Sequence, residues 1–209
     1  ENIEIISSNQ LRIKFSEVVD SVPAMIKENY FVNESIGIPF SLLLSDDQQQ
    51  VDLLFVNSFP QSSNLVLTVK NIEDECQNKL DSQTIDFSYY IAQSHDVVIN
   101  EIMADPDPAV YLPAYEYIEI YNKTDFNVSL SGWSLIAGTT IRTISAYTLK
   151  PKSYLILCSE AAFPYLKDYG YTHIVSGFPS LSNSGQSLIL KSKQGSIIST
   201  VTYQDSWYK

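Results

Sequence analysis

The sequence predicts an all-β protein with two β-sandwich domains in tandem. Apolar and polar residues alternate along many short segments, which is the period of strands that bury one face. The chain contains 14 Tyr and 9 Phe against 2 Met, and aromatic rings suit half-buried strands better than helices. Its 209 residues fit one large β domain or two small ones, and 44% hydrophobic residues supply a packed core.

Alternation marks five strands in the first half of the chain, with turn formers between them and no helical period. Strands at this short spacing are typical of a sandwich. One short helix is predicted over Val22 to Glu28, started by Ser21 ahead of Pro23. The inward-facing residues of the predicted strands are Ile3 and Ile5; Leu11, Ile13 and Phe15; Val51, Leu53 and Phe55; Leu65, Leu67 and Val69; and Phe87, Tyr89 and Ile91.

Three segments of the first half, 11–20, 29–32 and 69–80, carry recognisable motifs. Together they resemble the Ig-like domain of bacterial surface-layer and surface-adhesive proteins, and the resemblance covers residues 1–91. Those domains usually carry Gly before the Asn of the last motif, where this chain has Gln77. We expect Asn78 to make the turn, because Asn tolerates a positive φ.

The second half contains six strand-like runs, at 97–102, 116–122, 129–135, 149–157, 181–190 and 194–203, and the third carries Gly132-Trp133. In order and spacing these runs resemble the lamin-tail domain, which implies an immunoglobulin-like fold. Lys152 stands where that family commonly has Gly in a turn, and Gln186 where Asp is common. The predicted fold class is therefore all-β, with two tandem immunoglobulin-like β-sandwich domains.

The predicted domain boundaries follow from these resemblances. A first Ig-like domain spans residues 1–91, the polar segment 92–96 is a short linker, and the lamin-tail domain spans 97–209. The sequence ends on the aromatic pair Trp207-Tyr208 before Lys209, so we expect the natural polypeptide to continue and the second domain to be truncated at its C-terminus. The chain starts in a strand pattern at Glu1, which indicates that a signal segment was removed.

Aromatic residues of the second domain divide into two groups. Trp133 is predicted to fill the core, since a single Trp beside strands more often packs inside a sandwich than contacts a ligand. Tyr203, Trp207 and Tyr208 lie together near the end of the chain. They form either an exposed ligand-contact patch or the frayed edge of a truncated strand.

Charge and cysteine content exclude several classes of partner. Thirteen Lys and Arg against 24 Asp and Glu give a net charge of −11, and the cations are scattered, so nucleic-acid binding is not expected. No apolar run approaches the roughly 20 residues that span a bilayer, so direct membrane insertion is not expected either. Cys76 and Cys158 are predicted to be free thiols, and two cysteines alone do not make a zinc site.

The acidic residues are the best candidates for chemistry. A weak calcium site is assigned to Glu101, Asp105, Asp107 and Glu116, because loop carboxylates supply the oxygen ligands that calcium needs. The alternative is a solvated loop whose acids hydrogen bond to turns. Glu101 and Glu119 are expected to be neighbours on paired strands, but glycoside hydrolysis needs a cleft between two carboxylates and the sequence indicates none. No other metal and no cofactor is predicted.

Nucleophilic catalysis has no supporting motif. His95 lies in the predicted linker and His173 in a loop, and neither stands beside a nucleophile motif. Glycosylation sequons start at Asn33, Asn122 and Asn127 and are interpreted as ordinary turn residues.

The two resemblances imply a non-catalytic structural or adhesive interaction module of a larger exported bacterial protein, located outside the cell or on its surface. Its partner is then a protein or a cell-surface polysaccharide, and flanking domains of the same polypeptide are expected. The alternative is a carbohydrate-binding accessory module attached to a secreted hydrolase. Aromatic side chains gathered outside the core on one face would favour that alternative.

Overall fold

The computed structural model describes residues 2–109 and 111–208, except for the side chain of Tyr208. The chain divides into two compact units, Glu1–Tyr90 and Ile91–Lys209. Strands form nearly all of the regular structure in both units, which confirms the prediction of an all-β, immunoglobulin-like fold. Among the described residues, every helix is too short or too polar to cross a membrane.

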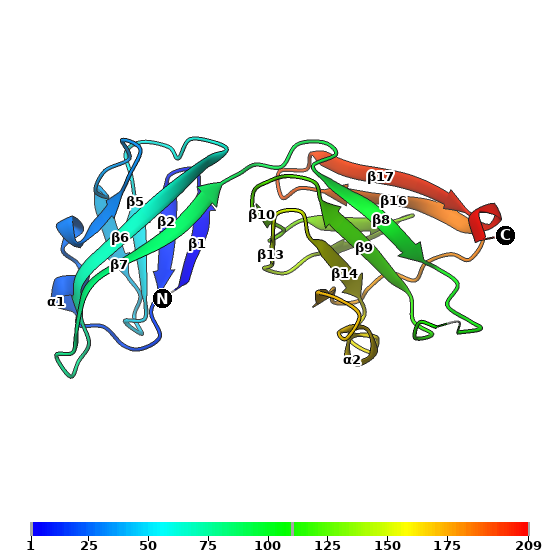
Figure 1. The fold of residues 1–209 in the computed structure, drawn as a ribbon, viewed down its shortest axis with the longest axis horizontal. Helices are drawn as coiled ribbons and strands as arrows, with labels where there is room; N and C mark the ends of the chain where they lie inside the picture. Colours follow the sequence, from blue (N-terminus) through cyan, green and yellow to red (C-terminus); the bar gives the residue numbers. More distant parts are fainter. Residues whose placement is uncertain (1, 110, 209) are drawn as a thin grey trace. The chain divides into compact units, whose positions relative to one another are not determined.

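The first unit is a sandwich of two antiparallel sheets (Figure 1). Leu11, Ile13, Leu53, Leu65 and Leu67, all predicted to point inward, are fully buried between the two sheets. The four-stranded sheet has the order β1 (Asn2–Ser7), β2 (Gln10–Lys14), β5 (Gln50–Leu54) and β4 (Ser41–Leu44). The three-stranded sheet has the order β3 (Tyr30–Val32), β6 (Ser63–Glu73) and β7 (Lys79–Tyr89).

The predicted helix of the first unit is shorter than the sequence indicated. Helix α1 spans only Ser21–Ala24, and a 3-10 turn, η1 (Lys27–Asn29), follows it. The helix stops because Ile26 adopts an extended backbone, with φ −87° and ψ 114°. Asp20, not Ser21, caps the helix, since its carboxylate accepts a hydrogen bond of 2.8 Å from the Val22 amide.

The β6–β7 turn also differs from expectation. Gln77, and not Asn78, carries the positive φ, which is 65°. The Asp74 carboxylate stabilises this turn by accepting hydrogen bonds of 2.8 Å from the amides of Cys76 and Asn78.

The second unit contains two four-stranded sheets and one short pair (Figure 1). One sheet has the order β15 (Thr172–Ile174), β14 (Tyr154–Cys158), β9 (Tyr117–Asn122) and β8 (Val97–Met103). The other has the order β12 (Thr140–Thr143), β11 (Ser134–Ala137), β16 (Gly185–Lys191) and β17 (Ile197–Gln204). The short pair is β10 (Val128–Ser129) with β13 (Thr148–Leu149), and the helical turns are α2 (Phe163–Leu166) and η2 (Asp205–Tyr208).

Trp133 of the second unit lies where the sequence predicted, and Lys152 lies in a turn as expected, but Gln186, which was expected in a turn, belongs to strand β16. Trp133 is 4% exposed and belongs to the core. Gly132 before it has φ 77°, a backbone conformation that favours glycine. Lys152, at the turn where Gly is common, has φ 50°, and its Nζ donates to the Lys123 carbonyl and pairs with Asp125 at 3.3 Å.

The segment 92–96, predicted to be a linker, is part of the second unit. Ala92 is 8% exposed, and the His95 amide donates a 2.8 Å hydrogen bond to the Ile198 carbonyl. The Asp96 carbonyl accepts from the Lys123 amide at 2.7 Å. The polar residues of segment 92–96 therefore belong to a hydrogen-bonded turn of the second unit and not to a flexible linker.

Candidate functional site

The outer face of the β15–β14–β9–β8 sheet carries the best candidate site. Side chains alternate across a strand, so Leu155 and Leu157 of β14 are buried inside while Tyr154 and Ile156 face outward. The register pairs Tyr154 with Tyr121 and Ile156 with Glu119 of β9. These four outward residues form one continuous patch.

Helix α2 and a small hydrophobic cluster beneath it cover part of the outer face. Helix α2 lies over this side of β14 (Figure 1), and its Leu166 packs with Tyr117, Ile156 and Cys158. Burial raises the pKa of the Cys158 thiol to about 11, so this cysteine stays protonated and acts as a small apolar residue. Tyr154, which lies on the same side of β14 at its other end, is outside this cluster and is 48% exposed.

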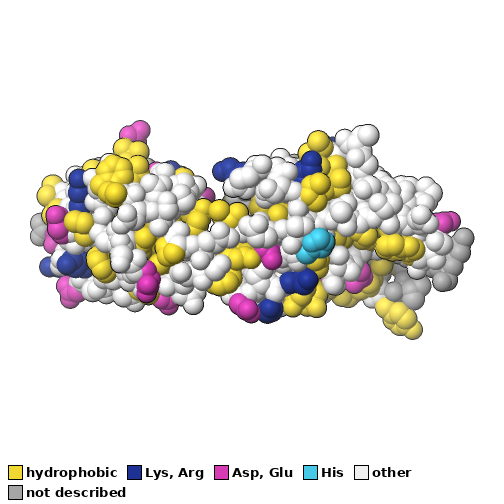
Figure 2. Space-filling model, turned by 90° about the horizontal axis from the view of Figure 1, so that it is seen from above, with side chains coloured by type: hydrophobic (Ala, Val, Ile, Leu, Met, Phe, Trp, Pro, Cys, Tyr) yellow, Lys and Arg dark blue, Asp and Glu magenta, His cyan; other side chains and the backbone are white. Residues whose placement is uncertain are grey.

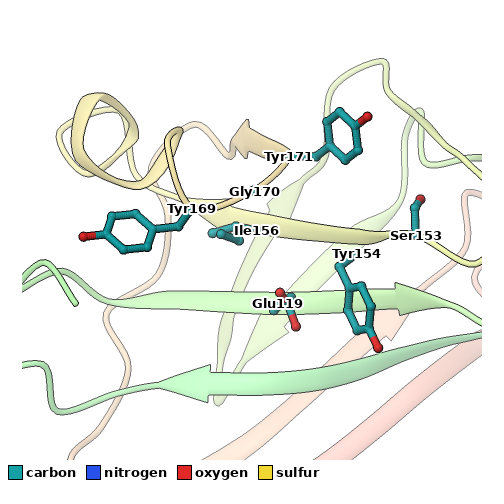
Figure 3. A pocket seen from close by; sticks show the side chains of 7 residues that line it. All are labelled: Glu119, Ser153, Tyr154, Ile156, Tyr169, Gly170 and Tyr171. Carbon is teal, nitrogen blue, oxygen red and sulfur yellow. The ribbon is translucent and has the colours of Figure 1, made fainter. Parts of the chain in front are cut away.

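A pocket of about 330 Å³ lies at the open part of the face (Figure 3). Tyr154, Tyr169 and Tyr171 line it, together with Glu119, Ser153, Ile156 and Gly170, and we call it the tyrosine pocket. Figure 3 shows Glu119 and Tyr154 side by side on β9 and β14, with Tyr169 and Tyr171 at the two ends of the loop that crosses Ile156.

Gly170 brings that loop close to the sheet. A Cβ atom at this position would lie 3.7 Å from Ile156 Cδ1, so the bare backbone passes directly over Ile156. The two flanking tyrosines remain largely in solvent, with exposed fractions of 54% for Tyr169 and 61% for Tyr171. The sequence alone did not predict this pocket, although the run Tyr169-Gly170-Tyr171 was a local signal of it.

The pocket combines aromatic surfaces with a carboxylate. Tyr154 stacks on Tyr121, with ring centroids 4.4 Å apart and an interplanar angle of 26°. Glu119 accepts a 2.8 Å hydrogen bond from Asn100 Nδ2, which orients its carboxylate. At the rim, Lys150 Nζ lies 5.9 Å from the centre of the Tyr171 ring.

The four calcium candidates do not come together. Glu101 accepts a hydrogen bond from the Tyr117 hydroxyl, and Asp105 accepts one of 2.9 Å from Asn183 Nδ2. Glu116 accepts from the Leu181 amide at 3.1 Å, and burial raises the pKa of its carboxyl group. Asp107 is exposed. Within residues 2–109 and 111–208, no three acidic, His or Cys side chains form a group that could hold a metal ion.

The paired acids do not form a hydrolytic cleft. Glu101 and Glu119 are register partners on β8 and β9, as expected, but only Glu119 lines the tyrosine pocket. His173 Nε2 lies 2.9 Å from Ser145 Oγ, and the imidazole packs against the Tyr147 ring at 5.0 Å. Burial lowers the pKa of His173. In the described part of the chain no carboxylate contacts this histidine to complete a triad.

The predicted C-terminal contact patch is partly wrong. Tyr203 is fully buried, and its hydroxyl donates a 2.9 Å hydrogen bond to the Ser182 carbonyl, so it is a core residue of β17. The prediction failed because Tyr203 lies within β17, which ends at Gln204, and not in the segment that follows the strand. Trp207 is 60% exposed on η2 and stays a candidate contact. The side chain of Tyr208 lies outside the described residues.

Surface charge gives no sign of a nucleic-acid interface. On the face drawn in Figure 2, Lys and Arg side chains lie singly or in small groups among acidic ones. The chain as a whole carries 13 cationic against 24 acidic residues. Phosphate backbones need a concentrated basic surface.

Comparison with known proteins gives a match for the second unit. The model of the family described as Lamin Tail Domain matches residues 91–205. Comparison with curated proteins gives no match.

Several solved structures are similar to the chain. The N-terminal part of the bacterial S-layer protein SbsC is 14% identical with a TM-score of 0.43, over 98% of this chain and 43% of that chain. The S-layer protein rSbsC is 10% identical with a TM-score of 0.40, over 97% of this chain and 40% of that one. The YadV chaperone is 14% identical with a TM-score of 0.30, over 93% and 90% respectively. The chain thus spans less than half the length of the S-layer proteins.

Proposed function

The chain belongs to the lamin tail domain family, and from this premise we propose that it is a non-catalytic structural and adhesive interaction module of a larger exported bacterial protein. The observation that carries this proposal is that its acidic side chains are engaged in hydrogen bonds within the fold. Glu101, Asp105 and Glu116, the residues best suited to chemistry, each accept a hydrogen bond from the surrounding fold.

These hydrogen bonds have a structural purpose. Glu116 fixes the chain at Leu181, 65 residues away, and Asp105 fixes it at Asn183, 78 residues away. Catalytic acids and bases instead need a free proton-transfer position facing a cleft. Two β-sandwich units, each compact in itself, suit a role as a spacer that presents loops and strand edges to partners. We place the module outside the cell or on its surface, in contact with proteins and beside flanking domains.

Binding to cell envelopes tests the proposal. The purified chain, labelled with a fluorophore, is sedimented with isolated bacterial envelopes at increasing concentration, and a heat-unfolded sample serves as control. We expect saturable binding by the folded chain that is lost when the envelopes are treated with protease. Sedimentation equal to that of the unfolded control would contradict the proposal.

A second candidate is a carbohydrate-binding accessory module attached to a secreted hydrolase. The gathering of Tyr154, Tyr169 and Tyr171 outside the core on one face favours it. In the same assay this candidate predicts binding that survives protease and is lost when periodate oxidises the envelope sugars.

A further inference from the structure

We propose that the tyrosine pocket binds one neutral pyranose ring of a polysaccharide. This inference rests on the second candidate function and names the site and the ligand. A volume of about 330 Å³ lies at the lower end of the range of small-molecule sites, roughly 300–1,000 Å³, so the pocket accepts a sugar unit and not a folded partner.

The aromatic rings match the apolar face of a sugar. A pyranose ring exposes C–H groups on its faces and hydroxyl groups around its edge, so its faces are apolar and its edge is polar. Tyr154 is held by its stack on Tyr121, and a ring fixed in advance loses little entropy when a ligand covers it. Tyr169 and Tyr171 are each more than half exposed, so both keep ring surface that a ligand can cover, although Lys150 Nζ lies over one face of Tyr171. Tyrosine is among the residue types that contribute most to binding energy.

The polar group of the pocket selects the same ligand. The Glu119 carboxylate accepts hydrogen bonds and donates none, and Asn100 occupies one of its several acceptor positions. The ligand must therefore offer hydrogen-bond donors next to an apolar surface. Sugar hydroxyl groups do so, whereas proline-rich peptides, the other common ligand of aromatic grooves, have no N–H group at each proline.

Charge decides between classes of sugar. The Glu119 carboxylate and the net charge of −11 disfavour uronic acids and other anionic sugars, and Lys150 lies at the rim next to Tyr171 and not beside Glu119. The site therefore takes neutral units, such as hexoses, pentoses or N-acetylhexosamines.

Calorimetric titration of the full chain tests the proposal. The probes are neutral hexaoses of glucose, mannose, galactose, xylose and N-acetylglucosamine, with hexagalacturonic acid and a proline decamer for comparison. We expect at least one neutral hexaose to bind. Tyr171→Ala should weaken that binding about tenfold, the effect of one aromatic contact. Tyr171→Phe should retain it, and Tyr111→Ala, a change at a 97% exposed tyrosine outside the pocket, should leave it unaltered.

A second pair of variants tests the carboxylate. Glu119→Gln keeps the side-chain shape and an oxygen for Asn100, and should lower affinity several-fold because a neutral oxygen is the weaker acceptor. Glu160→Gln removes an exposed charge outside the pocket and should change nothing. Thermal unfolding of each variant shows that it is folded.

The outcomes separate this inference from the proposed function. No binding of any neutral hexaose at millimolar concentration overturns the inference, as does preference for the anionic sugar or the proline peptide. Binding that Tyr171→Ala and Glu119→Gln leave unchanged also overturns it, since the sugar then binds elsewhere. If envelope binding nevertheless survives protease and is lost after periodate oxidation, the second candidate function stands and the failure is confined to the pocket; if that binding is absent too, the second candidate itself has failed.

Discussion

Replacing Asn122 with Ala is expected to destabilise the second unit by about 3 kcal/mol. Asn122 is fully buried at the end of β9. Its Nδ2 donates to the carbonyls of Phe126 at 2.8 Å, Lys150 at 2.9 Å and Leu149 at 3.2 Å. Its Oδ1 accepts from the amide and the hydroxyl of Thr124 at 2.9 and 2.8 Å. One side chain thus ties the loop after β9 to the segment before β14.

The magnitude follows from the number of groups that lose a partner. The two Nδ2 hydrogens, shared among three carbonyls, and the two hydrogen bonds accepted by Oδ1 amount to four full hydrogen bonds, and at about 0.8 kcal/mol each they total about 3 kcal/mol. At about 4 °C per kcal/mol for a unit of this size, the melting temperature should fall by roughly 12 °C. Asn122→Asp should cost more, because it turns the donor into a second acceptor facing three carbonyl oxygens.

Tryptophan fluorescence during urea unfolding measures this change. Both tryptophans of the chain, Trp133 and Trp207, belong to the second unit, so the signal reports that unit alone. Asn127→Ala is the matched control, since Asn127 lies in the same loop and is exposed. A loss of stability below 1 kcal/mol for Asn122→Ala, or an equal loss for Asn127→Ala, would show that the hydrogen bonds of Asn122 do not stabilise the second unit as described.

Three further predictions concern a turn, an ion pair and the thiols. Gly185→Ala should destabilise the second unit by about 3 kcal/mol, because the new Cβ would lie 2.4 Å from the Tyr203 carbonyl oxygen and the backbone has φ 106°. Gly195→Ala, where a Cβ would meet no atom within 4 Å, should cost about 1 kcal/mol in the same fluorescence assay. Arg12→Ala should lower the stability of the first unit by about 2 kcal/mol, because it removes hydrogen bonds of 2.6 Å and 2.9 Å from Asp52, which is 7% exposed. Lys14→Ala breaks a solvent-exposed ion pair with Glu4 and should cost below about 0.5 kcal/mol. Circular dichroism during unfolding measures both. A thiol reagent should modify the exposed Cys76 in the folded chain and Cys158 only in urea, and modification of two thiols without urea would contradict the buried position of Cys158.

Strand positions could be predicted well because alternation is a local signal. Leu11 and Ile13, or Leu65 and Leu67, alternate with polar neighbours and are buried for that reason. Trp133 after Gly132 was equally legible, since glycine there provides a positive φ.

Features that depend on pairing between distant strands could not be predicted. Asn122 looked like a turn residue in a sequon, and only the approach of Leu149 and Lys150 shows that it is a buried hub. The tyrosine pocket requires the register of β14 on β9 and the return of the chain through α2, which no local period encodes. Tyr203 was placed at the surface because its neighbours at the chain end are aromatic, and only the pairing of β17 with β16 and the hydrogen bond to the Ser182 carbonyl show that it is a core residue.

Saturation binding of the labelled chain to bacterial envelopes measures whether the folded module makes specific contacts. If the module binds its partner through surface contacts and Glu101 serves only the fold, the binding isotherm is saturable and Glu101→Gln leaves it unchanged. Binding should also disappear together with the tryptophan signal of the folded second unit when urea is added. An isotherm that rises linearly with concentration, or that persists after this unit has unfolded, would show that the folded module does not make specific contacts.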